Sequence, residues 1–331
     1  MKIVIIALTD GGKQLADRIC AFQSNSFVDN RDVPVFSKIA DIWQQKPDAI
    51  ICIMATGIVV RALSTLCRGK GQDPCVLVLD EKGKFVISFL SGHLGGGNKL
   101  ATEIAEKLGA QAVITTASDV TGHTALDLWA KKNQLYIENS QKLTEKSAKL
   151  VNNGSLKVFS DVQYDILPHD FKVVSSVDDA DIIISARIHE ESTALLLSPR
   201  IFSVGLGCNR GTKPEDFQVA VSELFNDEGF AENAICNFAS IDLKSDEQGM
   251  LDYVAREGHP INFYAKEQLN SVENVSSSAV VLAATGAKGV AEPAAVLAAE
   301  TEFGPGKLIV RKRKWKDVTA AVAIQRIRLV A

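Results

Sequence analysis

Several features that mark particular classes of protein are missing from this sequence. None of its six cysteines forms a C-x-x-C pair with another, and no spacing typical of zinc or iron–sulfur ligands is present. No stretch contains the roughly 18 consecutive apolar residues that a membrane-spanning helix needs. The first apolar run, Ile3–Leu8, is too short to be the core of a signal peptide. We therefore expect a cytoplasmic protein with reduced cysteines and no membrane segment.

A strong net charge is missing as well. The formal net charge of the 331 residues is −4, which argues against a general nucleic-acid-binding protein. The run Arg311–Lys316 is basic, but it lies between two strand-like segments, so its charges would alternate between two faces. We interpret it as a solvated sheet edge. An anionic ligand would therefore need positive groups gathered at one place.

What the sequence does contain is typical of a folded protein with more than one domain. Apolar residues make up 46% and charged residues 23% of the chain, and 331 residues are too many for one ordinary core. Val/Ile runs such as Ala49–Ile53 are typical of strands buried on both faces, and hence of parallel sheets covered by helices. We predict an α/β protein with two α/β domains of mostly parallel sheets, residues 1–137 and 201–331, joined by a small middle module, residues 138–200.

Apolar periodicity defines the expected elements. In the N-terminal domain we expect strands at Lys2–Leu8, Val33–Phe36, Asp48–Met54, Cys75–Leu79, Lys84–Phe89 and Ala112–Thr116. The helices expected there are Lys13–Phe22, Lys38–Gln44, Ile58–Cys67, Asn98–Leu108 and Thr124–Asn133. The middle module has few expected strands, at Leu156–Phe159, Asp181–Ala186 and Thr193–Leu197. In the C-terminal domain we expect strands at Ser203–Leu206, Asn237–Ile241, Ile261–Tyr264, Ala279–Ala283, Lys307–Arg313 and Thr319–Ile324. Its expected helices are Pro214–Phe225, Glu247–Glu257 and Glu292–Ala299.

The most suggestive motif is a glycine-rich turn, residues 91–100, between a predicted strand and a predicted helix. Glycine lets a backbone approach a ligand closely, and free N–H groups at the start of a helix attract anions. The motif matches neither the phosphate loop of nucleotide-binding proteins nor the dinucleotide fingerprint. His93 within it is a candidate acid or base. The alternative is an ordinary tight turn in which Asn98 caps the helix. The candidate binding glycines are Gly92, Gly95, Gly96 and Gly97.

Polar groups follow two other predicted strands of the N-terminal domain. In open α/β sheets, ligands bind at the carboxyl ends of strands, although such residues are also common in turns and helix caps. The candidates after the strand Asp48–Met54 are Thr56, Gly57 and Arg61, with Lys70 in the basic loop beyond. The candidates after the strand Ala112–Thr116 are its last residues, Thr115 and Thr116, together with Asp119.

The C-terminal domain repeats the pattern of a strand followed by a glycine-containing turn. Its G-x-G-x-x-x-G spacing departs from the dinucleotide fingerprint by one residue. Cys208 could be a nucleophile, but a small packed thiol is the alternative. Glu292 precedes Pro293 at a helix start, where it could act as an acid or simply complement the helix dipole. The remaining candidate binding residues are Gly207, Arg210, Gly211, Thr212, Asp242 and Lys244.

Taken together, these motifs resemble those of the cobalamin biosynthesis G proteins (CbiG), the cobalt-precorrin-5A hydrolases of the anaerobic pathway. The likeness covers nearly all of the first and last domains, and the order and spacing of the motifs are specific. The matching blocks are Ala55–Arg61, Asp73–Pro74, Gly92–His93 with Gly95–Gly96 and Asn98, Val113–Asp119, Gly205–Thr212, Ala239–Glu247 and Gly289–Ala295.

The resemblance implies an enzyme that opens the ring-A δ-lactone of a cobalt tetrapyrrole and releases acetaldehyde. The substrate would carry many carboxylates, which the glycine turns and the cations Arg61, Lys70 and Arg210 would bind. Cobalt would arrive with the substrate, so no cofactor is expected, and neighbouring pathway enzymes are the expected protein partners. His93 or Asp119 would activate water, and Glu292 would protonate the ring. The alternatives are a tetrapyrrole S-adenosylmethionine methyltransferase and a non-catalytic corrinoid carrier.

Overall fold

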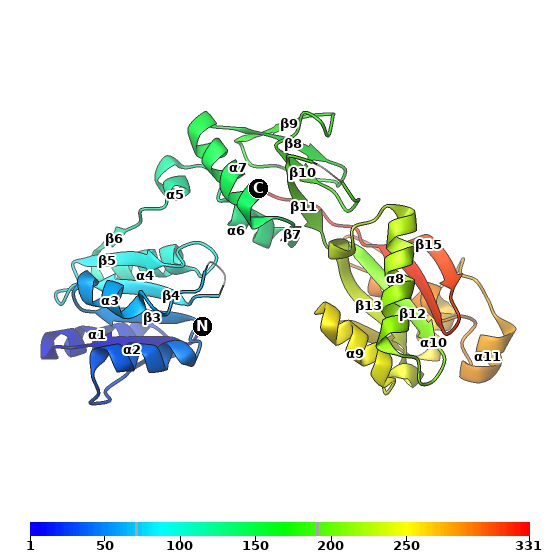
Figure 1. The fold of residues 1–331 in the computed structure, drawn as a ribbon, viewed down its shortest axis with the longest axis horizontal. Coiled ribbons are helices and arrows are strands. Elements are labelled where there is room, and N and C mark those ends of the chain that lie inside the picture. The colour runs from blue at the N-terminus through cyan, green and yellow to red at the C-terminus, as the bar shows by residue number, and fades with distance from the viewer. Residues whose placement is uncertain (70–71, 190–191) are drawn as a thin grey trace. The chain divides into compact units, whose positions relative to one another are not determined.

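The protein, described here by a computed structural model, divides into two compact units, Met1–Leu128 and Trp129–Ala331. The structure describes residues 1–69, 72–189 and 192–331. Within these residues, three mixed, mostly parallel sheets carry the fold, one in the first unit and two in the second (Figure 1). Among the described residues, no helix combines the length and the apolar character needed to cross a bilayer. The predicted α/β class is confirmed.

The first unit contains a six-stranded sheet with the order β2-β1-β3-β4-β5-β6. Its strands are β1 (Ile3–Ala7), β2 (Ser26–Val28), β3 (Ala49–Ile53), β4 (Cys75–Leu79), β5 (Phe85–Leu90) and β6 (Gln111–Val113). Its helices are α1 (Asp10–Phe22), α2 (Val35–Gln44), α3 (Thr56–Leu63), α4 (Gly97–Leu108), α5 (Ala117–Thr121) and the start of α6 (Leu126–Lys132). All residues of β1, β3 and β4 are buried, as the apolar runs predict.

Helices cover both faces of this sheet. On one face, α1 and α4 pack against the central strands through residues such as Leu15 and Ile104. On the other face, α2 and α3 do so through residues such as Ile39 and Val59. Full burial of one such side chain contributes about 1.5–3 kcal/mol, so the two apolar layers fix the loops at the strand ends.

One strand reversal decides where those loops lie. β1, β2, β3 and β4 are parallel, but β5 pairs antiparallel with β4, with Val76 opposite Leu90 and Leu79 opposite Val86. β6 then runs parallel to β5. The carboxyl ends of β5 and β6 therefore lie at the edge where β3 and β4 begin. The loop after β3 lies at the opposite edge.

The second unit begins with a five-stranded sheet of the order β7-β11-β10-β8-β9. Its strands are β7 (Leu135–Ile137), β8 (Leu156–Ser160), β9 (Phe171–Val173), β10 (Ile182–Ile184) and β11 (Leu195–Pro199), with helix α7 (Ser140–Asn153) between β7 and β8. The prediction placed residues 135–137 in the N-terminal domain, whereas β7 pairs with β11. β8, β9, β10 and β11 are mutually parallel, and β9 was not expected from the sequence.

The other sheet of this unit has the order β14-β13-β12-β16-β15. Its strands are β12 (Phe202–Cys208), β13 (Ile235–Ile241), β14 (Ile261–Tyr264), β15 (Lys307–Lys314) and β16 (Val318–Ile324). The accompanying helices are α8 (Pro214–Glu228), α9 (Gln248–Glu257), α10 (Lys266–Ser271), α11 (Ala279–Thr285) and α12 (Ala291–Ala298), with 3-10 turns at Glu232–Ala234 and Asp242–Lys244. The basic strand β15 lies at the edge of the sheet, as the charge pattern predicts.

Close packing of α12 on β12 depends on one glycine. A Cβ atom at Gly205 would overlap the carbonyl oxygen of Ala291 and lie 2.8 Å from the backbone nitrogen of Ala295. Since any larger residue would push the helix away, Gly205 sets the distance between the sheet and α12.

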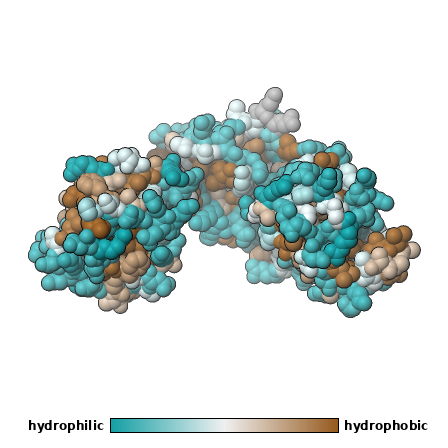
Figure 2. All heavy atoms as spheres, turned by 60° about the horizontal axis from the view of Figure 1, so that its bottom comes forward, coloured by the Kyte–Doolittle hydropathy of each residue, from teal (hydrophilic) through white to brown (hydrophobic). Residues whose placement is uncertain are grey.

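Two expected strands are wrong. Ala279–Ala283 belongs to helix α11, because the Ser278 hydroxyl accepts a hydrogen bond from the Val281 N–H and Gly286 ends the helix in a left-handed conformation. Val280 is 80% exposed, and Figure 2 shows an apolar patch at the right-hand end, where α11 lies. Val33–Phe36 instead leads into α2, with Pro34 preceding its first residue.

Candidate functional site

A group of polar and titratable side chains in the first unit surrounds His93. The Nε2 atom of His93 lies 2.8 Å from Asp119 Oδ2 and 3.2 Å from Ser118 Oγ. The Nδ1 atom lies 3.4 Å from Asp127 Oδ1. The amide of Asn98 donates a 2.8 Å hydrogen bond to the same Asp119 oxygen. The imidazole is therefore held between two carboxylates, one at each ring nitrogen.

Three segments supply these residues. His93 lies in the turn after β5, Asn98 is in the first turn of α4, and Ser118 and Asp119 belong to α5, after β6. Because β5 and β6 are parallel, their carboxyl ends meet at one edge, and the Asn98 amide joins them by a 3.2 Å contact to Thr116 Oγ1. The motifs around Gly92–Asn98 and Thr116–Asp119 are thus brought together, while Thr115 is exposed beside them.

The glycine turn has fewer unbonded backbone N–H groups than an anion site requires. The N–H of Gly96 donates to His93 O at 2.8 Å, that of Gly97 to Ser91 O at 3.2 Å and that of Asn98 to Gly92 O at 2.9 Å. Gly96 adopts a φ of +79°, which closes the turn. These N–H groups therefore form the turn itself, and the predicted cradle of free donors at Gly95, Gly96 and Gly97 is reduced accordingly.

The charge state of His93 follows from its neighbours. The hydrogen bond to Asp127 raises the pKa of His93, burial opposes this, and Asp119 raises it further. Conversely, burial alone would raise the pKa of Asp127, but the bond to His93 lowers it. These contacts shift the imidazole toward its protonated form, in which both ring nitrogens donate. A protonated imidazole is an acid and not a base.

Asp127 and the hydroxyl of Ser118 are the members of this group that sequence reasoning did not select. Ser118 stands inside the Thr115–Asp119 motif, directly before the chosen Asp119. Asp127 occupies the first turn of α6, where an acidic residue has the ordinary explanation of complementing the helix dipole. Its pairing with a histidine 34 positions earlier is visible only in three dimensions.

The candidates Thr56, Gly57 and Arg61 lie at the opposite edge of the sheet, because they follow β3. Thr56 lines a mostly apolar pocket of about 460 Å³ together with Met54 and Phe85. The guanidinium of Arg61 folds back toward Gly57, with Nη2 3.7 Å from the position of an added Cβ. Within the first unit, the predicted binding motifs thus form two separate groups. Lys70 lies outside the described residues.

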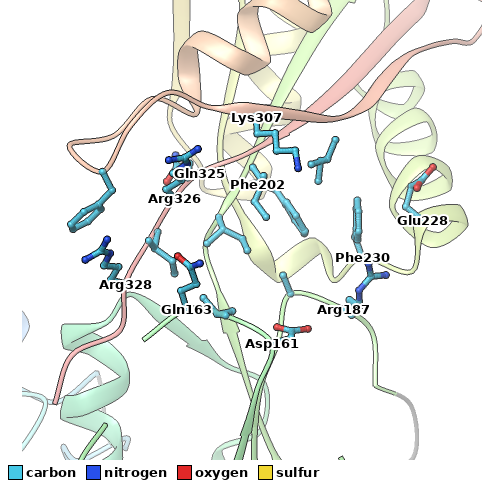
Figure 3. Close-up of a pocket in the computed structure, with 17 residues that line it drawn as sticks. Asp161, Gln163, Arg187, Phe202, Glu228, Phe230, Lys307, Gln325, Arg326 and Arg328 are labelled. Atoms are coloured by element: carbon cyan, nitrogen blue, oxygen red, sulfur yellow. The ribbon is translucent and has the colours of Figure 1, made fainter. Parts of the chain in front are cut away.

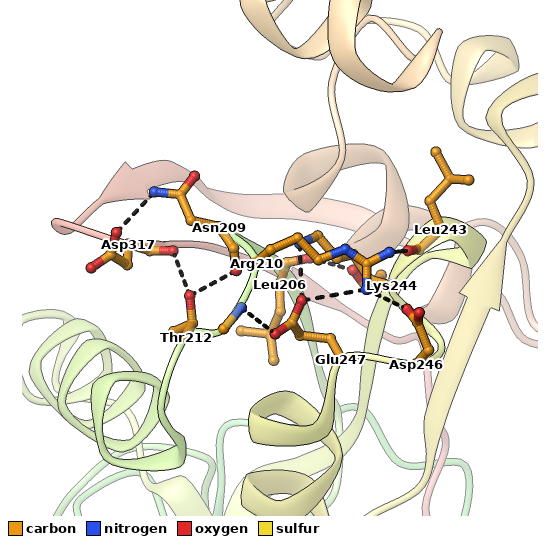
Figure 4. Close-up of polar contacts among 11 residues, drawn as sticks. Leu206, Asn209, Arg210, Thr212, Leu243, Lys244, Asp246, Glu247 and Asp317 are labelled. Carbon is orange, nitrogen blue, oxygen red and sulfur yellow. Dashed lines mark hydrogen bonds and ion pairs between the residues drawn. The ribbon is translucent and has the colours of Figure 1, made fainter.

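In the second unit, two loops at the carboxyl edge of the C-terminal sheet form a network of charges (Figure 4). Arg210 Nη1 lies 2.5 Å from Asp246 Oδ1, and Arg210 Nη2 donates to Leu243 O at 2.9 Å. The buried carboxylate of Glu247, 4% exposed, accepts from Gly211 N at 2.7 Å and from Lys244 Nζ at 3.2 Å. The candidate cations Arg210 and Lys244 therefore already have carboxylate partners.

The remaining candidate residues at this edge form hydrogen bonds within the protein. The Thr212 hydroxyl donates to Asn209 O at 2.9 Å, and the Gly207 carbonyl accepts from Thr319 at 3.3 Å. Asp242 is exposed and accepts the N–H of Leu243 at 2.8 Å. Burial raises the pKa of the Cys208 thiol, which Lys244 only partly offsets, so the thiol form is favoured.

Glu292 is 2% exposed and holds two backbone segments together. Its carboxylate accepts from Ser276 N at 2.6 Å, Ser276 Oγ at 2.9 Å and Lys312 N at 2.9 Å. Burial would raise the pKa of Glu292, but these hydrogen bonds and Arg311 lower it. An ionised carboxylate with three donors fits a positioning role, and it does not fit the predicted proton donor.

Three family descriptions match successive parts of the chain. Residues 37–119 match the N-terminal region of the cobalamin synthesis G proteins, residues 124–199 match the cobalamin biosynthesis central region, and residues 202–323 match the cobalamin synthesis G C-terminus. These ranges contain His93, Asp119, Asp127 and Glu292.

Curated relatives match over most of their length. A cobalt-precorrin-5A hydrolase from Priestia megaterium is 33% identical, over 83% of this chain and 78% of the relative. One from Salmonella typhimurium is 29% identical, over 97% of each chain. Among solved structures, a homolog of cobalamin biosynthesis protein G from Sulfolobus solfataricus is 20% identical over 98% of this chain and 97% of its own, with a TM-score of 0.39.

Proposed function

The chain belongs to the cobalamin synthesis G family, and from this premise we propose that it is a cobalt-precorrin-5A hydrolase of anaerobic cobalamin biosynthesis. It would open the ring-A δ-lactone and release acetaldehyde, giving cobalt-precorrin-5B. The observation that carries the chemistry is the histidine held between Asp119 and Asp127, with Ser118 and Asn98 alongside. Such a group can move protons during attack of water on a carbonyl.

The first step is attack of water on the lactone carbonyl. Asp119, 37% exposed, is the member of the group that solvent reaches most readily, and as a carboxylate it takes the proton of the attacking water. Protonated His93 places its positive charge beside the oxyanion that forms, because a positive group stabilises developing negative charge. Asn98 holds the Asp119 carboxylate in place by its 2.8 Å hydrogen bond.

The second step follows from the substrate. When the tetrahedral intermediate collapses, the carbonyl carbon becomes a carboxylate and the lactone oxygen leaves as an alkoxide. The alkoxide forms the C=O bond of acetaldehyde as the adjacent carbon–carbon bond breaks, and the electron pair enters the conjugated macrocycle. One water is consumed, and the macrocycle takes up a proton from His93 or from the acid form of Asp119.

Location, cofactor and partners are part of the same proposal. Cobalt is carried by the substrate, so the reaction requires no cofactor resident in this chain. The cytoplasm supplies the tetrapyrrole, and neighbouring enzymes of the pathway are the expected protein partners. Nucleic acid and membrane have no part in the scheme, in keeping with the net charge of −4.

The test is anaerobic incubation of the full chain with cobalt-precorrin-5A, with acetaldehyde trapped as a hydrazone and the product mass measured. We expect stoichiometric acetaldehyde from the wild type. His93→Gln is expected to slow release by about 10²–10⁴, the usual range for loss of an acid–base group. His169→Gln, at an exposed histidine, is the matched control and should react normally.

Two outcomes would contradict the proposal. Binding of the tetrapyrrole without any acetaldehyde would indicate a corrinoid carrier. Transfer of a methyl group from added S-adenosylmethionine, seen as a mass increase of the macrocycle, would indicate a methyltransferase.

A further inference from the structure

A large groove in the second unit lies away from the loops considered above. Its volume is about 980 Å³, within the range of cavities that hold sizeable ligands (Figure 3). We call it the inter-sheet groove. One wall follows the carboxyl ends of β8 and β10, at Asp161–Gln163 and Ala186–Arg187. The other wall is formed by the start of β12 and by Lys307 and residues 324–328.

The floor of the inter-sheet groove is apolar. The rings of Phe202 and Phe230 are buried there, with centroids 4.6 Å apart. Ile309, Ile324 and Ile327 line the groove and are partly exposed. Such a surface suits a flat, largely apolar ring system, because contact removes apolar area of both partners from water.

The charges at the rim are mostly positive. Arg187, Lys307, Arg326 and Arg328 line the groove, against Asp161 and Glu228. Both acidic groups are engaged, since Asp161 accepts from the Ser185 hydroxyl at 2.6 Å and Glu228 pairs with Arg313.

The cations are less engaged. Arg328 has an exposed partner, Asp165, at 3.4 Å, and such surface pairs contribute little. No carboxylate within residues 1–69, 72–189 and 192–331 forms an ion pair with Lys307 or Arg326. Figure 3 shows both side chains among the groove residues.

The loop network at the other end of β12 also contains cations, but these have carboxylate partners. There, Arg210 and Lys244 are already paired with Asp246 and Glu247. The inter-sheet groove begins at Phe202, the first residue of β12, whereas the loop network begins after Cys208, its last residue. Of these two groups of cations, the groove is therefore the one with side chains that form no ion pair with the described carboxylates, Lys307 and Arg326.

We propose that the inter-sheet groove binds the macrocycle of a polycarboxylate tetrapyrrole, with its ring on the apolar floor and its carboxylates on Lys307 and Arg326. The identification of the ligand class rests on the proposed function, whereas the site itself rests on volume, apolar floor and unpaired cations. Bonds between a guanidinium or ammonium group and a carboxylate are short and about twice as strong as neutral ones.

The experiment uses the full chain and uroporphyrin, a tetrapyrrole that carries acetate and propionate groups, in a fluorescence titration. We expect saturable binding that weakens with added salt. Lys307→Glu and Arg326→Glu should each weaken binding at least tenfold, which corresponds to about 1.4 kcal/mol. Arg326→Lys, which keeps the charge, should retain most of the affinity. Lys316→Glu, at a side chain 95% exposed in the same unit, is the control for net charge and should bind almost as the wild type does.

Circular dichroism should show that all four variants keep the wild-type fold, since the substituted side chains are exposed. Wild-type affinity in both Lys307→Glu and Arg326→Glu, or an equal loss of affinity in Lys316→Glu, would overturn the groove as the binding site. Acetaldehyde release is read separately with cobalt-precorrin-5A. If the protein releases acetaldehyde but its affinity for uroporphyrin does not depend on Lys307 and Arg326, the groove proposal is wrong and the proposed function stands. If it binds uroporphyrin through these two residues but releases no acetaldehyde, the groove proposal stands and the proposed function is wrong.

Discussion

Asp127 Oδ1 lies 3.4 Å from the Nδ1 atom of His93, while Asp119 occupies the opposite nitrogen of the same ring at 2.8 Å. The ring is only 17% exposed, so both carboxylates act on it with limited screening. Their combined effect raises the pKa of His93 above its ordinary value of 6.5.

The first prediction concerns this pairing. Asp127→Asn removes one of the two negative charges, so the pKa of His93 should fall by about one unit or more. NMR titration of the His93 ring measures this directly, and the alkaline limb of the rate of acetaldehyde release should move to lower pH with it. Asp17→Asn, at an exposed aspartate, should change neither. An unchanged His93 titration in Asp127→Asn would remove Asp127 from the group.

The same shift predicts how stability depends on pH. Because the native pKa of His93 is raised, its pairing stabilises the fold fully below about pH 6.5, the unfolded value, and the contribution is lost as pH rises through the native pKa. The difference in unfolding free energy between wild type and His93→Gln should therefore shrink as pH rises. Urea unfolding at a series of pH values measures it, and a difference that grows with pH would contradict the assignment.

The second prediction separates two ways of attacking the lactone. If Asp119 activates water, Ser118→Ala should slow acetaldehyde release only a few-fold, whereas Asp119→Asn should slow it by about 10²–10⁴. If Ser118 is instead a nucleophile, Ser118→Ala should be the more damaging change, and a rapidly quenched reaction should contain protein with an added acyl mass on Ser118. Single-turnover kinetics with intact-protein mass spectrometry distinguish the two.

The third prediction concerns Glu292. Glu292→Gln replaces an acceptor of three hydrogen bonds and should lower the unfolding free energy of the second unit by about 3 kcal/mol at neutral pH. Its native pKa is lowered, so this stabilisation is present above about pH 4.5 and lost as pH falls through the native pKa. Wild type and variant should therefore converge in acid.

Urea unfolding monitored by tryptophan fluorescence measures both effects of Glu292→Gln. Glu302→Gln, at an exposed residue, is the control and should unfold as the wild type does. A Glu292→Gln protein of wild-type stability that releases no acetaldehyde would restore Glu292 as a proton donor.

The fourth prediction tests the contact between α12 and β12. Gly205→Ala places a methyl group where the Ala291 carbonyl lies, so it should destabilise the second unit by about 3 kcal/mol or more. Gly57→Ala adds the same group where the nearest neighbour is 3.7 Å away, and its fold should be unaffected. Thermal unfolding of the two variants compares them, and equal melting temperatures would show that α12 can shift at no cost.

Apolar runs such as Ala49–Ile53 were sufficient to predict buried parallel strands, because only burial on both faces allows such sequences. Ala279–Ala283 was not predicted correctly, since a short apolar run suits a strand or a helix equally and the capping by Ser278 decided between them. The motif at His93 was visible because glycines and polar groups cluster there in the sequence.

The sequence does not reveal the direction of each strand in the sheet, and this direction decides which loops lie at the same edge. The motifs at Thr56 and His93 each follow a strand and look equivalent, yet the antiparallel pairing of β4 and β5 sends them to opposite edges. Asp127 was missed for a related reason, because its partner is distant in the chain and its local setting already has an explanation. Lys307 and Arg326 are distant in sequence from residues 161–163 and 186–187, which form the opposite wall of the groove. Only the tertiary structure shows that they line one groove.

The antiparallel direction of β5 also determines how mutations at the two edges of the first sheet combine. Loops at opposite rims of the first sheet are separated by about the length of a five-residue strand, roughly 15 Å, which exceeds the range over which substitutions usually couple. Changes at Thr56 and at His93 should therefore combine as independent contributions. One rim can acquire new specificity through successive mutations while the other keeps its chemistry.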